Sequence, residues 1–566
     1  MDNKKILITS AWPYLNVTPH IGNVVSSHLS ADVVARYFRL KGADTVMVSG
    51  SDEHGTPIEV EAIRSGITPK ELTDRLHVKV TQLLKEWGIS YDNYTRTENP
   101  IHKEFVRNLL MRIYDNGYIF DQDTTMLYCE NCERFLPDRY VEGKCPYCGY
   151  EHARGDQCEL CSRLLETTLL VEPYCAICKS KPIVKNTRHW YFDMPKLSDK
   201  LAFYIKENKQ FATNVKKFSL NIIQEGLKPR AVTRDVAWGI PAPFPGSENK
   251  TIYVWVEAVL GYVSATIEFF KNKGEPENWK DFWFNKKAKT MYFIGKDNIP
   301  FHTIILPALL LASGEDYNLP WNVSATEYLQ FVGEKASKSQ RRGIFMDEAL
   351  QLFPPDCWRY FLMSSRPETK DSDFSWELFT EKINADLNDT FGNFVHRTLT
   401  FINSQFNGEI PEAKTMAEED KNILKSMGEK AAQTAEEIQN CKLQAAANTM
   451  MSLARLGNQY LNEKEPWNLV KKDKSQSESV LNIASNIVKA LSIISEPFIP
   501  FTAERIWSTL NLPGSVHNQT WEETLKPLPV RQRIEKSKPL FQKIEATEQE
   551  LNELLVQARS TLAKKN

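Results

Sequence analysis

The chain has 566 residues, of which 42% are hydrophobic and 25% charged, which excludes a disordered or a fibrous protein. Because one hydrophobic core stops growing well below this length, we expect several packed units. The 70 basic side chains nearly balance the 72 acidic ones, so a nucleic acid would have to be bound through local basic patches.

The N-terminal segment, Met1–Ser10, is charged and then strand-like, without the basic, apolar and small-residue order of a signal peptide. The longest apolar stretch, residues 303–313, contains a proline and is shorter than the ~20 residues that a membrane span needs. We therefore expect a cytoplasmic protein that does not cross a membrane.

The first predicted unit alternates strands with helices. Apolar runs at 6–8 and 46–48 are typical of short buried strands, and the segment between them carries Leu29, Val33 and Tyr37 at helical spacing. This order predicts an α/β fold with a doubly wound parallel sheet, similar to the Rossmann fold. A further strand-like run at 290–294 follows only after a long cysteine-containing segment, so we expect an insertion that interrupts the sheet.

The predicted insertion contains eight of the ten cysteines, and its helical periodicity is poor. The eight form four C-x-x-C pairs, a pattern that favours metal thiolates over disulfides in a protein that is not exported. They suffice for two tetrahedral zinc sites, whose role is structural because four thiolates leave no position for water. The spacing allows three ways of combining the pairs. The cysteines are Cys129, Cys132, Cys145, Cys148, Cys158, Cys161, Cys175 and Cys178.

From about Ile383 onward the pattern changes to amphipathic helices, which predicts an α-helical bundle. Polar stretches at 407–422 and 471–479 are predicted to be surface loops within it. A charged amphipathic helix is expected near residues 545–563.

Two segments have the chemistry to bind phosphate. His20-Ile21-Gly22-Asn23 lies between the first strand and its helix, where free N–H groups and the helix dipole favour anions; a turn with a capping histidine is the alternative. Farther on, Lys335 and Lys338 lie three apart in a glycine-flanked loop that can close on a polyphosphate, although alone it is a solvated charge run. The sequence contains neither a P-loop nor a dinucleotide fingerprint.

These two segments resemble the H-I-G-H and K-M-S-K-S signatures of class I aminoacyl-tRNA synthetases. Segments 50–57, 253–258 and 295–302 resemble the methionyl branch in particular, and the similarity runs in order from about Ile6 to Pro500. The resemblance implies that the chain activates L-methionine with ATP and Mg²⁺, releases pyrophosphate, and transfers the methionyl group to tRNA(Met).

The resemblance also implies the roles of individual residues. Asp52 would bind the α-amino group of methionine. The pocket would consist of Ala11, Trp12, Tyr14, Trp255, Ala258, Val259, Tyr262 and His302. ATP would contact His20, Gly22, Asn23, Gly295, Asp297, Lys335 and Lys338. The residues implied to act in catalysis are His20, Asn23, Arg234, Lys335 and Lys338.

For the metal sites the family implies a nested arrangement, with the four inner cysteines on one ion and the four outer ones on another. In the bundle it implies that Asn393, Arg397 and Trp467 read the anticodon, since an amide, a guanidinium and an indole can bond to and stack on unpaired bases. The implied divisions are a catalytic domain in two halves (1–116 and 231–325), a connective insertion with zinc knuckles (117–230), a stem-contact region with the lysine loop (326–382), an anticodon-binding domain (383–535) and a helical tail (536–566).

The sequence departs from the family pattern at four positions. Asn23 replaces a histidine and Ala336 a methionine in the two signatures, while Trp12 and Val259 stand where the family often has leucine and proline. These changes leave open a related class I synthetase for leucine, isoleucine, valine or cysteine, and a non-catalytic zinc-knuckle RNA-binding paralogue. A small-molecule adenylyltransferase is a third alternative, but it would not need the helical bundle. We expect a monomer.

Overall fold

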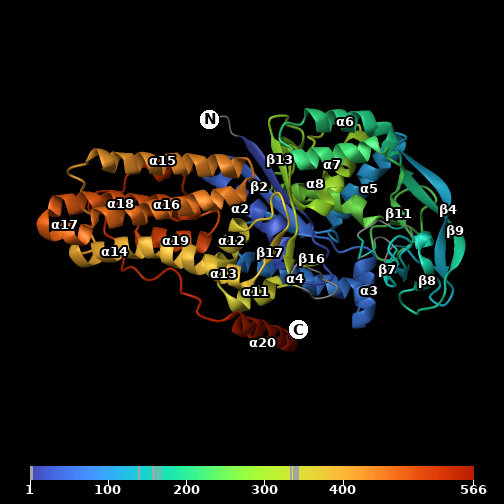
Figure 1. The fold of residues 1–566 in the computed structure, drawn as a ribbon. Coiled ribbons are helices and arrows are strands. Elements are labelled where there is room, and N and C mark those ends of the chain that lie inside the picture. The colour runs from blue at the N-terminus through green and yellow to red at the C-terminus, as the bar shows by residue number, and fades with distance from the viewer. Residues whose placement is uncertain are drawn as a thin grey trace.

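The computed structural model describes residues 4–137, 140–155, 158, 160–161, 165, 167–331, 334–335 and 343–565, with 334, 335 and 565 described by their backbone alone. The molecule is elongated, with a mixed α/β body and a helical bundle that extends from one side of it (Figure 1). The cysteine-containing insertion lies at the opposite end of the body from the bundle.

The centre of the body is a five-stranded sheet in the order β14-β13-β1-β2-β3, with all neighbours parallel. The strands are β1 (Lys5–Ser10), β2 (Asp44–Ser51), β3 (Asn93–Arg96), β13 (Lys289–Gly295) and β14 (Asn322–Thr326). This confirms the predicted doubly wound parallel sheet. Because a parallel sheet is buried on both faces, its central strands β1 and β13 contain consecutive apolar residues, whereas the edge strand β3 has the polar sequence NYTR.

Alternate residues of β1 belong to two different cores. Ile6 and Ile8 pack on one face with α2 (Leu29–Leu40), whereas Leu7 packs on the other with α8 (Val254–Asn272). The second face is also covered by α5 (Pro100–Asp115) and α10 (Leu306–Ala312), and the remaining helices of the body are α3 (Thr56–Ser65), α4 (Pro69–Glu86) and α9 (Lys280–Trp283).

The insertion is built on a long antiparallel pair, β4 (Ile119–Cys129) with β9 (Ile183–Phe192), flanked by β5 (Arg134–Phe135) and β10 (Arg230–Ala231). A small sheet of β6 (Val141–Lys144), β7 (Ala153–Arg154) and β8 (Val171–Cys175) precedes or contains the cysteines from Cys145 to Cys178, whereas Cys129 ends β4. The expectation of poor helical structure here is wrong for α6 (Ser198–Glu207) and α7 (Thr213–Gln224), which bury Leu201, Ile205 and Val215.

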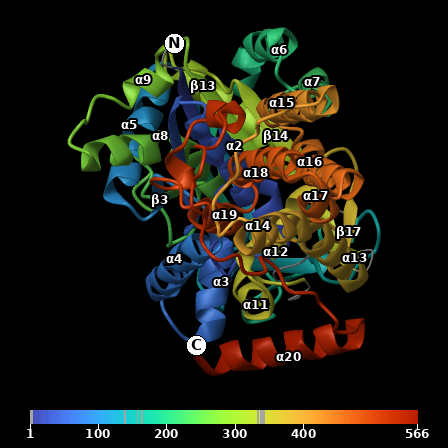
Figure 2. The same cartoon turned by 90° about the vertical axis from the view of Figure 1, so that its left-hand side faces the viewer.

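A three-stranded sheet of β16 (Glu334–Lys335), β15 (Leu329–Phe331) and β17 (Ser372–Phe374) follows the central sheet. It leads through α11 (Met346–Leu352), α12 (Pro355–Ser364) and α13 (Trp376–Lys382) into the bundle. The last helix, α20 (Glu548–Lys565), returns to pack against α11 and α13, and Figure 2 shows it lying outside the bundle.

The bundle surrounds α18 (Lys474–Ser495), which is buried from Ser479 to its C-terminal end. Its other elements are η7 (Ile383–Gly392), α14 (Asn393–Gln405), α15 (Glu418–Gln439), α16 (Leu443–Lys464), α17 (Pro466–Lys472) and α19 (Pro500–Thr509). The predicted loop at 471–479 is wrong, because the side chain of Asp473 accepts from Gln476 N at 3.0 Å and starts α18 within the polar run. No described helix is both long and apolar enough to cross a bilayer.

Candidate functional site

The H-x-G-N segment forms the turn that follows β1 and begins α1 (Ile21–Asn23) and η1 (Val24–His28). His20 caps this turn: its Nδ1 accepts from Asn23 N, and Asn23 Oδ1 accepts from His20 N, each at 3.3 Å. Gly22 must lack a side chain, since a Cβ there would lie 2.9 Å from His20 Nδ1. The histidine that was predicted to contact phosphate therefore also makes the capping interaction that we gave as its alternative.

The end of the lysine loop lies against this turn. The backbones of His20 and Phe345 form an isolated antiparallel bridge, and Ile21 N donates to Ile344 O at 2.9 Å. On the other side of the loop, the backbone of Lys335 pairs with Gln330 between β16 and β15. Both borders of the loop are thus close to β1, whereas Lys338 lies outside the described residues.

Asp52 lies just beyond β2, where its backbone bridges Tyr14. Its side chain is 2% exposed, and Oδ1 has no hydrogen-bond partner within the described part of the chain. Burial and the nearby carboxylate of Glu257 raise the pKa of Asp52 well above its usual range. A buried carboxylate with an unpaired oxygen is suited to a cationic ligand, because it gains most when a charged donor reaches it.

Trp12 occupies a narrow slot beneath the predicted methionine pocket. A Cβ added at Gly50 or at Gly261 would lie only 2.6 Å from an indole carbon, so the ring fits between two glycines. The indole also packs edge-on against Tyr262, with ring centres 6.4 Å apart.

Tyr262 and His302 form the polar end of the same pocket. Nδ1 of His302 donates to Asn298 O at 2.9 Å, which leaves Nε2 as the acceptor for the Tyr262 hydroxyl at 2.7 Å. Burial lowers the pKa of His302 to about 4, so the ring is neutral at physiological pH. Ala258 and Val259 are buried in α8, the helix that also carries Tyr262.

The aromatic rings at the mouth of the pocket are stacked. Trp255 lies parallel to Phe301 at 4.3 Å between ring centres and meets Tyr14 edge-on at 5.5 Å. A small cavity of about 50 Å³ is lined by Tyr14, Trp255 and Arg234 among others. The guanidinium of Arg234 lies over the ring of Tyr253 at 3.5 Å and donates to Thr233 O at 2.9 Å, which fixes it at this edge.

The remaining residues predicted to contact ATP are at the end of β13. Gly295 ends the strand, and Asp297 follows in η5 (Lys296–Asn298), exposed on the side of the lysine loop. The hydroxyl of Tyr328 donates to the Asp297 carboxylate. Ala11, at the end of β1, donates its N–H to Phe293 O of β13 at 2.9 Å, so the ends of β1, β2 and β13 converge on one edge of the sheet.

The sequence analysis missed three charged residues beside Asp52, namely His54, Glu98 and Glu257. His54 bonds to both carboxylates, at 2.9 Å to Glu257 and at 2.8 Å to Glu98. His54 and Glu257 belong to segments that were singled out for their resemblance, but nothing in the sequence pattern indicates that they meet.

The cysteines form two tetrads, each with all four sulfur atoms within 4.8 Å of one another. The outer tetrad is Cys129, Cys132, Cys175 and Cys178, and the inner one is Cys145, Cys148, Cys158 and Cys161. Sulfur separations of 3.4 to 3.9 Å across them are close to the ~3.8 Å between thiolates on one tetrahedral ion with ~2.3 Å bonds. None of the eight forms a disulfide, and their grouping is the one that the nested arrangement requires.

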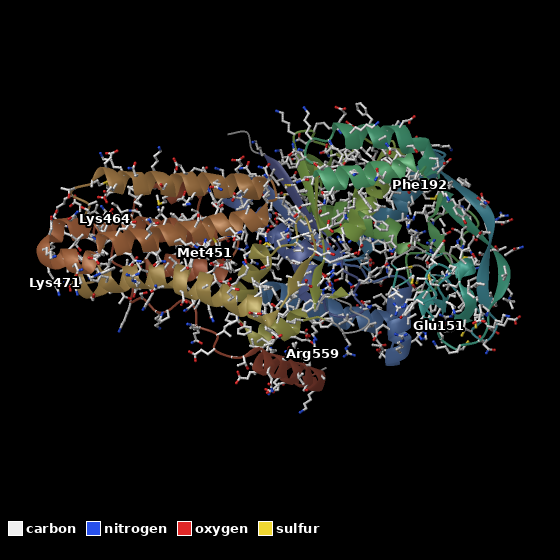
Figure 3. The ribbon with its side chains drawn as sticks, viewed as in Figure 1. Glu151, Phe192, Met451, Lys464, Lys471 and Arg559 are labelled. Carbon is white, nitrogen blue, oxygen red and sulfur yellow. The ribbon has the colours of Figure 1, made fainter. Side chains whose placement is uncertain are left out.

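The predicted anticodon residues lie at the far end of the bundle. The guanidinium of Arg397 lies 5.0 Å from the ring centre of Trp467 and donates to Asn462 Oδ1 at 3.1 Å, while Asn393 is exposed one turn earlier on α14. Lys464 and Lys471 lie at the same end, opposite the knuckles marked by Glu151 (Figure 3). The structure thus brings a cation, an indole and basic side chains together at the tip.

Comparison with known proteins gives consistent results over nearly the whole chain. The family model described as tRNA synthetases class I (M) matches residues 6–399, and that described as the anticodon binding domain of methionyl tRNA ligase matches residues 410–557. A methionine–tRNA ligase of Caldivirga maquilingensis is 51% identical over 97% of this chain and 93% of its own length. That of Thermofilum pendens is 50% identical over 96% of each.

Among solved structures, a methionyl-tRNA synthetase of Mycobacterium tuberculosis in complex with methionyl-adenylate has the same fold. Its TM-score is 0.79, with 22% identity over 95% of this chain and 99% of that one. The chain therefore belongs to the methionine–tRNA ligase family of class I aminoacyl-tRNA synthetases.

Proposed function

We propose that this chain is a methionine–tRNA ligase that forms methionyl-adenylate from L-methionine and ATP and then transfers the methionyl group to tRNA(Met). The observation that carries the proposal is the convergence of the H-x-G-N turn, Asp52 and the borders of the lysine loop on one edge of the parallel sheet. The relatives with this name support the reaction and the amino acid.

In the proposed first step, the carboxylate of methionine attacks the α-phosphorus of ATP in line with the departing pyrophosphate. Asp52 holds the α-ammonium group, and the aromatic pocket holds the thioether, which gains from sulfur–ring contacts. His20, Gly22, Asn23, Gly295 and Asp297 position the nucleotide. The cations of Lys335, Lys338 and Arg234 stabilise charge as it develops on the phosphates.

In the second step, a hydroxyl of the terminal ribose of tRNA attacks the carbonyl carbon of the adenylate, and AMP leaves. None of the assigned residues forms a covalent bond to substrate, so positioning and electrostatic stabilisation provide the rate enhancement. Mg²⁺ accompanies the phosphates of ATP as part of that substrate.

Each cysteine tetrad is proposed to hold one Zn²⁺. The thiolates supply all four ligands, so zinc would stabilise the small sheet of the insertion and would take no part in the reaction. Asn393, Arg397 and Trp467 are proposed to contact the anticodon loop. The monomeric state and the cytoplasmic location stay predictions from the sequence.

The test is ATP–pyrophosphate exchange with each of the twenty amino acids in turn. We expect exchange with methionine and at least ~10-fold less with leucine or isoleucine. A difference of one methylene or branch in the substrate provides ~1–3 kcal/mol of discrimination in an apolar pocket. Equal exchange with leucine or isoleucine would make the chain a synthetase of different specificity. No exchange with any amino acid would favour a non-catalytic RNA-binding paralogue.

A further inference from the structure

A buried chain of three ionisable side chains lies beside Asp52. His54 is 1% exposed, and Glu257 is fully buried in the first turn of α8. Nδ1 of His54 lies 2.9 Å from Glu257 Oε1, and Nε2 lies 2.8 Å from Glu98 Oε1. Because both ring nitrogens face carboxylate oxygens, only the doubly protonated imidazolium can donate to both.

His54 and Glu98 are charged at neutral pH, while burial raises the pKa of Glu257 and the charge of His54 opposes that rise. Burial by itself lowers the pKa of His54, but the carboxylates of Glu257 and Glu98 outweigh it and raise that pKa to about 10. Burial raises the pKa of Glu98, but hydrogen bonds from His54 and Lys103 bring it down to about 2. The order of charges is therefore negative, positive, negative.

Glu257 uses only one of its two oxygens in this chain. Among the described residues, Glu257 Oε2 has no hydrogen-bond partner, and His102 Nε2 is 4.0 Å away. Burial and the charge of His54 lower the pKa of His102 to about 3, so it supplies no positive charge. Glu257 Oε2 and Asp52 Oδ1 are thus two buried acceptors that both gain from a charged donor.

The charge balance indicates what kind of donor fits. The carboxylates of Asp52, Glu98 and Glu257 exceed the cations of His54 and Lys103 by one negative charge. An α-ammonium group bound at Asp52 completes the balance and brings N–H donors into a region that bulk water does not reach. The charged neighbours on the adjacent segment, Glu53 and Arg96, leave this balance unchanged because they pair with each other at 2.7 Å.

We propose that Glu257 is a positioning residue for the amino-acid substrate, which acts by neutralising His54 beside Asp52 and so lets the α-ammonium group bind. The proposal rests on the role given to Asp52 in the proposed function. Without the Glu257 carboxylate, His54 stays protonated through Glu98 and faces the substrate cation with an uncompensated like charge.

The experiment compares Glu257→Gln with Glu268→Gln. Both are carboxylates of α8, but Glu268 accepts only from the neutral amides of Asn93 and Asn99, at 2.9 and 2.6 Å, and so provides a matched control. The ligands are L-methionine, methioninol, which keeps the ammonium group, and 4-(methylthio)butanoate, which lacks it. Dissociation constants are measured by calorimetry, and the KM for ATP by pyrophosphate exchange.

We expect Glu257→Gln to raise the dissociation constants of L-methionine and methioninol about 10- to 100-fold, as for the loss of one charged hydrogen-bond partner. Its affinity for 4-(methylthio)butanoate and its KM for ATP should stay within about twofold of the wild type. For Glu268→Gln, the dissociation constants of all three ligands and the KM for ATP should stay within the same range. Equal weakening of ligands with and without the ammonium group would overturn the proposal, because it would show a purely structural role.

If Glu257→Gln does not fold, Glu257→Ala replaces it with the same expected loss of preference, and Glu257→Asp and Glu98→Gln are measured beside it. Glu257→Asp keeps the charge and should recover most of the preference for ligands that carry the ammonium group. Glu98→Gln removes the partly exposed partner of His54 and should leave that preference intact. Lack of methionine-dependent exchange in the wild type would refute the proposed function itself, whereas normal exchange with an unchanged ligand preference in Glu257→Gln or Glu257→Ala would refute only this proposal.

Discussion

The backbone of His20 pairs with that of Phe345, and this bridge joins the two signature segments at the edge of the central sheet. The same histidine caps α1 through Nδ1, so its imidazole has a structural contact in addition to its proposed contact with ATP. The two contributions can be separated by substitution, because asparagine is a good N-cap and alanine is not.

His20→Asn should keep the cap while it removes the imidazole. We expect its free energy of unfolding to stay within about 0.5 kcal/mol of the wild type, whereas His20→Ala should lose about 1 kcal/mol. Both should lower kcat for methionine-dependent exchange by about 100-fold, the usual loss for one donor to a developing charge. Denaturant unfolding and exchange assays measure the two effects, and full activity of His20→Asn would mean that the imidazole acts only as a cap.

Asp52→Asn should lower the activity of the protein and raise its stability. Burial raises the pKa of Asp52, so in the folded protein its ionised form is disfavoured, and this cost disappears with a neutral amide. We expect the variant to be more stable than the wild type at neutral pH, and its KM for methionine to rise about 100-fold. Thermal unfolding and exchange kinetics provide the comparison, and a less stable variant would contradict it.

The same raised pKa predicts the acid side of the pH profile. The ionised form of Asp52 binds the ammonium group, so kcat/KM for methionine should rise with pH through the pKa of the free enzyme and then level off. Because burial and the carboxylate of Glu257 raise the pKa of Asp52 well above its usual range, the midpoint should lie above that of an exposed aspartate. The stability contribution has the opposite sign: the folded state holds the proton longer, so this carboxyl lowers stability as pH rises through the same range.

Zinc content should follow the two cysteine tetrads. We expect two Zn²⁺ per chain, in line with the two groups of four sulfur atoms, and about one after Cys158→Ser. Chelation should destabilise the insertion, since metal binding contributes to its folding free energy. Cys441→Ser is the control, because this cysteine lies outside both tetrads. Metal analysis and thermal unfolding test the prediction, and an unchanged zinc content in Cys158→Ser would refute the four-thiolate site.

The tip of the bundle should affect tRNA and not the adenylation step. Trp467→Ala and Arg397→Ala should each raise the KM for tRNA by about 10- to 100-fold, the range for loss of one stacked base, and leave pyrophosphate exchange unchanged. Because the two side chains touch, their effects should not add in the double variant. Arg533→Ala, a change to an exposed arginine paired with Glu409, should alter neither step.

The features that the sequence predicted correctly are those that depend on residues close together in the chain. Apolar runs gave the parallel sheet, and cysteine spacing gave four-thiolate ligands, although the pairing needed the family resemblance. The polar run at 471–479 was wrongly predicted to be a loop because its composition is typical of loops. Its Asp473 instead caps the N-terminus of a buried helix by accepting from Gln476 N. Its later residues are enclosed by neighbouring helices that no local pattern reveals.

The charged chain at Glu257 could not be predicted for a different reason. His54 and Glu257 are separated by the whole insertion, and either residue alone is an ordinary polar side chain. Only the return of α8 to the face of β2 brings them to 2.9 Å. The methionine-pocket residues, by contrast, were predicted from the family resemblance of the segments that carry them, and they stay a prediction.

The slot that holds Trp12 constrains the order in which residues 12, 50 and 261 can be substituted. An indole fits only while Gly50 and Gly261 both remain without side chains, so neither glycine can mutate first without a clash. A smaller residue at position 12 would remove the obstruction at Gly261, whereas a Cβ at Gly50 would still lie 2.8 Å from Thr95 O. Loss of the tryptophan must therefore come before any change at Gly261, and a return to tryptophan requires that glycine to be restored.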